Sequence, residues 1–195
     1  MANFRAVFEV GNALEKFLQA RYPDDLNESF PCAFKLVSSA DIATEDTTPL
    51  DKTVSILLHR ITSNEHERSI TQLQDSRDKQ PVLALDLHYM ITYWGTSAEA
   101  EQVILTWTMQ QLQSLPILDR SVLSASAAWD ATETVQIIPA DLSLEDILRI
   151  WDALGPKYRL SVSYVARIVR IDRTAAPGPP VVTTRFTFEP VEDAP

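Results

Sequence analysis

The order of helices and strands predicted by this sequence is compatible with an α+β fold. Several regions repeat apolar residues at the three- and four-residue steps of a helix, and others alternate at the two-residue period of a strand. The chain has 195 residues, of which 45% are apolar and 23% charged, as is typical of one soluble globular domain. We therefore expect a single domain over residues 1–188, followed by a loose acidic tail at residues 189–195.

The chain opens with a predicted amphipathic helix over about residues 3–21, which Pro23 ends. Residues 32–37 and 54–61 are short apolar runs typical of strands, and the polar, acidic stretch 38–52 between them is predicted to be a loop. The apolar stripe predicted for the helix consists of Phe4, Val7, Phe8, Gly11, Leu14, Phe17 and Leu18.

The middle of the chain contains the clearest strand, residues 81–94. Asp86, His88 and Thr92 fall on one face of that strand, and the opposite face is predicted to be the centre of the core. Before it, residues 63–80 are polar almost throughout and indicate a long hairpin arm or loop. The predicted core face consists of Leu83, Leu85, Leu87, Tyr89, Ile91 and Tyr93.

The next helix is predicted to begin after Ser97, a suitable N-cap, and to end near Leu115. Residues 135–138 form a short strand candidate. Ser143, with Asp146 three residues later, resembles a capping box at the start of a further helix. The apolar stripe of that helix consists of Leu144, Ile147, Leu148, Trp151 and Leu154.

The C-terminal region returns to period two from Arg159 onward, which predicts a long strand with one solvated face. Residues 175–180 form a Pro-rich turn or linker, and residues 181–188 are a last strand candidate. The apolar face of the long strand is predicted to carry Leu160, Val162, Tyr164, Ala166 and Ile168.

Composition excludes several classes of function. The formal net charge is -10, so nucleic acid is an unlikely default partner. The four glycines are scattered and form no phosphate-cradling loop, and the single Cys32 is too little for a thiolate metal site. No stretch approaches the ~20 apolar residues of a membrane span, and the N-terminus shows no secretory signal. We expect a protein folded in the cytoplasm, without cofactor or metal.

The histidines are the natural candidates for chemistry. His66 lies between two glutamates in the polar arm, where a surface role is the favoured interpretation. His59 and His88 lie in predicted strands, and Asp86 shares a face with His88, so a catalytic pair is one hypothesis. The favoured alternative is a hydrogen-bonded polar pair on a sheet face, because no nucleophile motif accompanies it.

Basic residues gather in the C-terminal third of this acidic chain. Arg159, Arg167 and Arg173 are candidate contacts with acidic surface on a neighbouring subunit or partner, and an ordinary exposed strand face is the equal alternative.

Residues 56–64, 83–92 and 150–164 together resemble the N-terminal domain of tail-terminator (cap) proteins of contractile injection systems, the phage-tail-like particles of bacteria. The motifs that carry the resemblance are Leu-Asp-Leu-His-Tyr at 85–89 and Trp-x-Ala-Leu at 151–154, followed by Tyr-Arg-Leu-Ser from Tyr158. His59 departs from the tyrosine expected in its strand.

The resemblance implies an α+β fold in which a mixed or antiparallel sheet packs against helices. It also implies a non-enzymatic structural protein of the bacterial cytoplasm, a homohexameric ring that ends the inner tube and sheath and couples them at the distal end. The implied partners are further copies of the chain and the sheath and tube proteins, with no nucleic acid; membrane contact of the assembled particle stays open. The competing hypotheses are a small-molecule enzyme that uses Asp86 and His88, and an adaptor that tethers the particle or its cargo.

Overall fold

The computed structural model describes residues 2–43, 50–64, 83–123, 127, 129 and 132–171. These residues form a six-stranded sheet of order β1-β2-β3-β6-β5-β4, in which β1 is parallel to β2 and the other neighbours are antiparallel. The predicted mixed α+β architecture is confirmed. The strands are β1 (Ala33–Val37), β2 (Thr53–Ser63), β3 (Leu83–Trp94), β4 (Ile117–Leu118), β5 (Val135–Pro139) and β6 (Ser161–Ile171).

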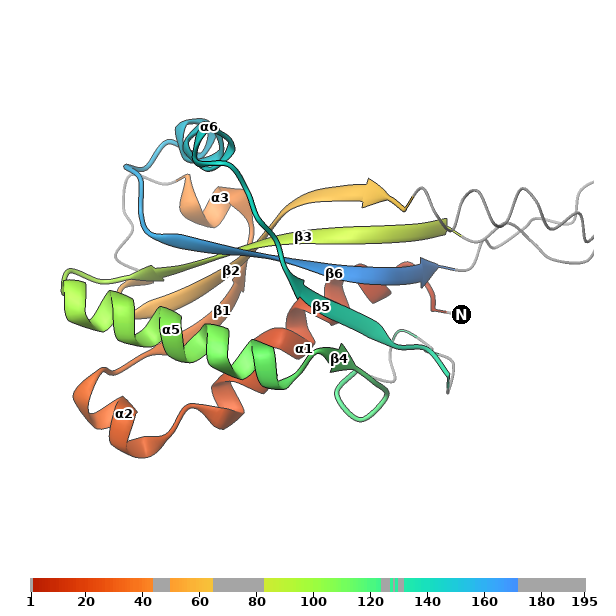
Figure 1. The fold of residues 1–195 in the computed structure, drawn as a ribbon, viewed down its shortest axis with the longest axis horizontal. Coiled ribbons are helices and arrows are strands. Elements are labelled where there is room, and N and C mark those ends of the chain that lie inside the picture. Colours follow the sequence, from red (N-terminus) through yellow and green to blue (C-terminus); the bar gives the residue numbers. More distant parts are fainter. Residues whose placement is uncertain are drawn as a thin grey trace, which may run out of the picture.

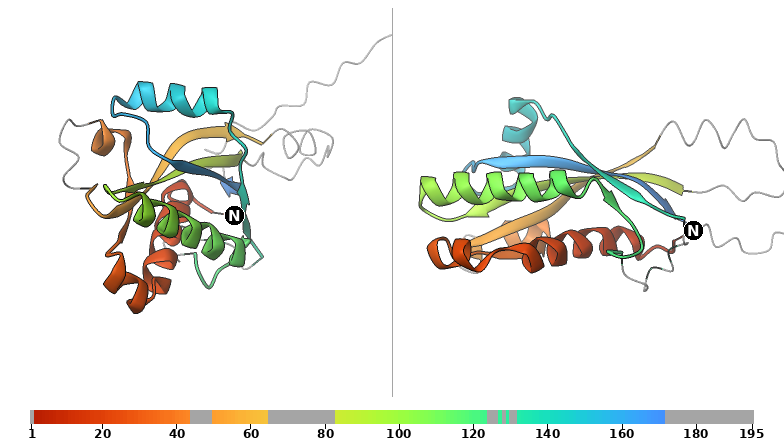
Figure 2. Two further views of the ribbon diagram at one scale, coloured as in Figure 1. Left: turned by 60° about the vertical axis from the view of Figure 1, so that its left-hand side comes forward. Right: turned by 60° about the horizontal axis from the view of Figure 1, so that its bottom comes forward.

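The helices cover the two faces of the sheet unequally. In Figure 1, α1, α2 and α5 lie on one side, and α3 and α6 lie on the other, an arrangement that the left view of Figure 2 repeats. The predicted N-caps Ser97 and Ser143 begin α5 and α6, and each side chain accepts a hydrogen bond from the backbone three residues on. The helices are α1 (Ala6–Arg21), α2 (Asp24–Ser29), α3 (Ser39–Ile42), α5 (Ala98–Ser114) and α6 (Leu144–Leu154).

The larger core lies between the sheet and the α1 and α5 helices. Leu87, Tyr89 and Ile91 of β3 are each at most 1% exposed there, which confirms the predicted facing of this strand over its central part. Toward its start, Leu83 is 48% exposed, so the core does not extend to the end of β3. Tyr22 stacks edge-on against Trp107, with ring centroids 5.0 Å apart, and so joins α1 to α5.

The smaller core lies on the opposite face, under α6. Trp151 packs against Trp94 with ring centroids 5.9 Å apart, and the indole N–H of Trp94 donates to Ser55 Oγ at 2.8 Å. Thr92 is 1% exposed and Asp86 8% exposed, although the sequence pattern predicts a polar face here. Around Thr92 this face of β3 is covered because α6 and the residues around α3 pack onto it. Asp86, farther from α6, is buried beside Asn64 and Arg167. The other buried members are Val37, Ile42, Leu50, Leu57 and Met90.

The predicted facing of α1 is wrong at two positions. Phe4, before the helix, is 80% exposed and Phe8 is 60% exposed. The face that packs on the sheet carries smaller residues instead, because α1 comes so close to β1 that a Cβ on Gly11 would lie 2.7 Å from the Leu36 side chain. The buried helix residues are Ala6, Glu9, Val10, Gly11, Ala13, Leu14 and Leu18.

The predicted facings of α6 and β6 also need correction. Leu144 is 65% exposed and Leu148 41% exposed, because Trp151 and the opposite flank of the helix make the contact with the sheet. In β6 the register with β3 shifts between the pairs Leu87↔Ala166 and Leu85↔Val169. The extra residue of this bulge puts Val169, rather than Ile168, into the core.

The loop prediction for residues 38–52 is partly wrong, since Ser38 caps the short helix α3. The predicted last strand 181–188 and the tail 189–195 lie outside the described residues, as does most of the polar arm 63–80.

Candidate functional site

A polar patch lies where β2, β3 and β6 run side by side beyond α6. The Asn64 amide donates to both carboxylate oxygens of Asp86, at 3.0 and 3.1 Å, and the Arg167 guanidinium lies 3.6 Å from the same carboxylate. His88, two residues along β3, is bonded through Nε2 to Thr62 Oγ1 at 2.9 Å. The polar patch thus consists of Thr62, Asn64, Asp86, His88 and Arg167.

Burial lowers the pKa of both histidines beside this patch. Burial and the nearby Arg60 lower the pKa of His88, although the charge of Asp86 opposes them. Burial, with the charges of His88 and Arg60, lowers the pKa of His59 to about 4. The His59 and His88 rings lie 6.2 Å apart between centroids. His59 Nε2 is buried and has no hydrogen-bond partner among the described residues.

The patch does not assemble the catalytic pair considered from the sequence. A catalytic carboxylate orients the histidine through its second ring nitrogen, and the histidine in turn activates a nucleophile. Here the contacts of the Asp86 carboxylate go to Asn64 and Arg167, and His88 contacts the Thr62 hydroxyl. Asp86 and His88 are thus polar residues on one sheet face, each hydrogen-bonded to another side chain rather than to the other. His66 lies outside the described residues, among which no three His, Cys, Asp or Glu side chains gather as metal ligands.

The predicted arginine face is not one patch. The Arg159 guanidinium stacks 4.9 Å above the Trp94 ring and donates to the Gly95 carbonyl at 3.0 Å. Arg167 lies farther along β6, beside Asp86, and is exposed. Arg173 lies outside the described residues. Arg159 thus fixes the β3–α5 connection against the segment before β6, whereas Arg167 faces solvent.

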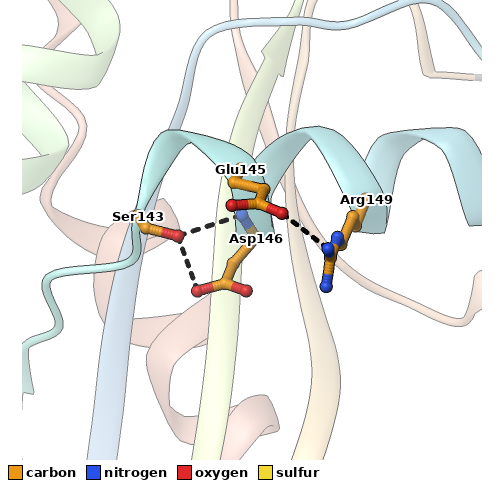
Figure 3. A network of polar contacts seen from close by, with 4 residues as sticks. All are labelled: Ser143, Glu145, Asp146 and Arg149. Atoms are coloured by element: carbon orange, nitrogen blue, oxygen red, sulfur yellow. Dashed lines mark hydrogen bonds and ion pairs between the residues drawn. The ribbon is translucent and has the colours of Figure 1, made fainter.

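The exposed flank of α6 is a second surface, shown at its N-terminal end in Figure 3. Ser143 Oγ accepts from the backbone N–H of Asp146 at 3.1 Å, and Glu145 pairs with Arg149 one turn on. Both charged side chains of that pair are 73% exposed. Leu144 and Leu148 are exposed on this same helix, so apolar and charged groups both face solvent here.

A third surface was missed by the sequence reasoning. Phe4 and Phe8 line a hollow of about 840 Å³ at the place where β1 ends, and Leu58 of β2 lies in its wall. The apolar residues of α1 extend around more than one helix face, since Val10, Leu14 and Leu18 form their own stripe at four-residue steps. This surplus of apolar residues on α1 indicates that some of them are not needed for the core.

Comparison with known proteins decides the family. The sequence matches the Pvc16 N-terminal domain family over residues 9–184. The chain belongs to that family. No curated protein matches the sequence.

The family assignment agrees with the fold of two solved structures. The chain is similar to the sheath/tube terminator, in the extended state, of the extracellular contractile injection system PVC, with TM-score 0.50 and 17% identity over 96% of this chain and 65% of that one. It is also similar to the tube-terminating cap of the anti-feeding prophage, with TM-score 0.53 and 18% identity over 93% of this chain and 61% of that one. This member of the Pvc16 N-terminal domain family therefore spans less than two thirds of either matched chain.

No helix among the described residues of this family member is both long and apolar enough to cross a bilayer.

Proposed function

We propose that this chain is a structural cap of a contractile injection system. Six copies form a ring that ends the inner tube and the sheath and couples the two at the distal end of the particle. The observation that carries the proposal is the family match over residues 9–184. The likeness of the fold to a sheath/tube terminator and to a tube-terminating cap supports it.

A ring of identical subunits suits this role physically. Cyclic symmetry repeats one heterologous contact until the ring closes, so the ring matches a tube of the same symmetry. A terminator then needs one face that fits the last layer of tube or sheath, and another that does not accept a further layer. The unequal cover of the present sheet supports such a role, since α1, α2 and α5 cover one side and α3 and α6 cover part of the other.

We propose no catalytic role for the polar patch. The Asp86 carboxylate is held by Asn64 and Arg167 rather than by His88, which favours a structural network. The Asp86→Asn and His88→Gln variants should alter stability only. A specific turnover lost in both variants would contradict the structural function.

The main test is removal of the gene from a strain that makes the particles. Without the cap nothing stops or locks the last layer, so negative-stain images should show sheaths of variable length or tubes without stable sheaths. Complementation with the wild-type gene is the control. Uniform, normal particles in the deletion strain would eliminate the terminator function.

A second test asks whether the arginines contact a partner. Since Arg159 holds Trp94 and Gly95 within the fold, its reversal should be made separately from the Arg167→Glu, Arg173→Glu double variant. Exposed ion pairs contribute only ~0.2 to 1 kcal/mol each, but a ring repeats every contact. The double variant should weaken association while sparing the fold, and Arg149→Glu on α6 is the matched control. Normal association of the double variant would eliminate these arginines as contacts.

A further inference from the structure

The β2 strand has an open edge. Its partner β1 pairs with it only from Thr53 to Leu57, whereas β2 itself continues to Ser63. Along Leu58–Ser63 the outer edge of β2 thus has no strand beside it in the described part of the chain. An unpaired edge presents backbone N–H and C=O groups, and an extended chain can pair with them.

Side chains of α1 protect the outer edge of β1, but this protection does not extend to the open edge of β2. The backbone N–H of Phe34 donates to Gln19 Oε1 at 3.1 Å, and that of Leu36 donates to Glu15 Oε2 at 2.7 Å. Side chains of α1 therefore occupy the outer donors of β1. This protection ends where β1 ends, so the open stretch begins at Leu58.

Hollows flank the open edge on both faces of the sheet. On the α1 face, Phe4, Val7 and Phe8 line the hollow of about 840 Å³ described above. On the α6 face, a smaller hollow of about 260 Å³ is lined by His59 and by Ile150, Ala153 and Leu154. Leu58 and Ser39 line both hollows. Ser39 and Leu58 thus separate the two hollows where the open edge starts, next to the β-bulge at His59. Since successive residues of a strand point to opposite faces, a strand paired along residues 59–63 would direct side chains toward both hollows.

The chemistry of the two hollows specifies the strand that fits. The larger hollow offers the exposed rings of Phe4 and Phe8, which favour large apolar side chains. The smaller hollow contains the buried His59 Nε2, which has no partner among the described residues and would accept or donate a hydrogen bond to a hydroxyl. The fitting strand therefore alternates large apolar residues with small or hydroxyl-bearing ones.

Residues 181–188 of this chain follow that alternation except at Thr184 and Arg185. One set of alternate residues is Val182, Thr184, Phe186 and Phe188, and the other is Val181, Thr183, Arg185 and Thr187. The first set offers a valine and two phenylalanines to the larger hollow, with Thr184 among them. The second set offers the hydroxyls of Thr183 and Thr187 to the smaller one, with Val181 and Arg185 beside them. The same segment is the last strand candidate of the sequence analysis.

We propose that residues 181–188 of one copy add as a strand to the open β2 edge of a neighbouring copy. This inference rests on the proposed ring and names the contact between its subunits. The described residues end at Ile171 of β6, which lies on the far side of β3 from β2. A strand beside β2 would lie three strand spacings from β6, about 14 Å, and a Pro-rich segment as long as residues 172–180 spans about 28 Å when extended. That reach allows the edge of a neighbour, which the closed ring of the proposed function requires to be contacted, and the isotope labels of the test below distinguish it from the segment's own edge.

The contact is heterologous, as a closed ring requires. The donated strand and the accepting edge are different surfaces, so each copy gives one and receives one. Every subunit would then have its β2 edge covered.

A photo-cross-linking experiment tests the contact directly. Phe8 is replaced by p-benzoylphenylalanine, and copies grown with light and heavy nitrogen are purified, mixed under conditions of subunit exchange and irradiated. We expect cross-links from position 8 to a peptide within residues 181–188, with one partner light and the other heavy. Cross-links confined to partners of one isotope would place the segment on its own chain and overturn the proposal. Cross-links to other segments, or none, would overturn it as well.

Sedimentation of variants provides the second measurement. The Phe186→Asp, Phe188→Asp double variant should raise the concentration needed for association by about tenfold or more, since aromatic anchors carry much of an interface's affinity. Phe8→Asp should act similarly, and the two changes combined should add little. Val191→Asp, just beyond the segment, is the matched control, and circular dichroism checks each fold. Unchanged association of the double variant would overturn the proposal.

The cap function and the strand addition can each be contradicted without the other. Light–heavy cross-links together with normal particles in the deletion strain would leave strand addition standing and remove the cap function. Irregular particles in the deletion strain without such cross-links would leave the cap function and remove strand addition.

Discussion

The two faces of the sheet are built on different principles. The face under α1 and α5 is a continuous apolar core that includes residues from every strand. The opposite face has a compact tryptophan cluster under α6 and then, farther along the same strands, the polar patch around Asp86. Helices of 16, 6 and 17 residues lie on one face, and helices of 4 and 11 residues lie on the other.

The two faces thus differ in what they contribute: one to the stability of the fold, the other to surfaces accessible to partners. The α1 and α5 face buries the central residues of β3, and burial of apolar side chains is the dominant favourable contribution to folding. The α6 face leaves leucines, charged pairs and part of the β2 edge accessible. Variants on the first face should therefore affect the whole fold, and those on the second should act locally.

The largest effect is expected from Leu87→Asp, at a residue that is 0% exposed in the larger core. The change buries an unpaired charge, and we expect a loss of more than ~4 kcal/mol, which leaves the domain unfolded or aggregated. Leu144→Asp, at an exposed position of α6, should stay within ~0.5 kcal/mol. Urea denaturation followed by tryptophan fluorescence measures both. An unchanged midpoint for Leu87→Asp would show that the facing of β3 is misassigned.

Trp151→Ala should have the next largest effect, about 3 kcal/mol. It removes the ring that packs on Trp94 and the hydrogen bond from its indole N–H to Ser161 Oγ at 3.2 Å. Because the two cores lie on opposite faces, hydrogen exchange should speed up in α6 while α1 and α5 keep their protection. Equal loss of protection in all three helices would show that the two faces do not act separately.

The pH dependence of stability sharpens the comparison further. The pKa of His59 is about 4 in the folded chain and 6.5 in an unfolded one, and burial is the largest cause. Above pH 6.5 both states are neutral and His59 has no effect. As the pH falls from 6.5 to about 4, the unfolded chain takes up the proton first, so the folded state loses stability.

Because solvent reaches part of the ring, we expect a loss of only about 1 kcal/mol from His59 across this range. Carboxylates titrate near its lower end, so the quantity to measure is the difference between wild type and His59→Gln in urea titrations at each pH. The wild type should lose more stability toward pH 4 than the variant. Parallel curves would contradict the assigned protonation of His59.

The sequence predicts the elements of this fold well because their signals are local. The alternation of residues 83–93 and the caps Ser97 and Ser143 depend on neighbours along the chain, and the structure places strands and helix starts there. The side chains with which a helix faces the sheet were less predictable. Whether Phe8 or Val10 meets the sheet depends on how closely α1 approaches β1 at Gly11, a tertiary distance that helical periodicity does not contain.

The candidate surfaces were predictable only in part. Asp86 and His88 were correctly placed on one face, but the sequence could not show that Asn64, which follows β2, donates to both carboxylate oxygens. The sequence pattern places Arg159 and Arg167 on one strand face. In the structure Arg159 instead stacks on Trp94. The open β2 edge follows from the different lengths of β1 and β2, which become visible only when the strands are paired.

The smallest effect is expected from Arg167→Gln, on the more open face. Arg167 is 46% exposed and its guanidinium lies 3.6 Å from Asp86, while Asn64 donates to both oxygens of that carboxylate. Removal of the cation leaves those two hydrogen bonds in place, so we expect a loss of about 0.5 kcal/mol or less. Arg149→Gln, in the exposed pair with Glu145, should cost a similar amount and is the control. Thermal denaturation at low and high salt measures both, since screening weakens an exposed pair. A loss above ~2 kcal/mol for Arg167→Gln that salt does not change would mean that Asp86 depends on this cation as a buried charge does, and the α6 face would then be held by electrostatics rather than left open for contact.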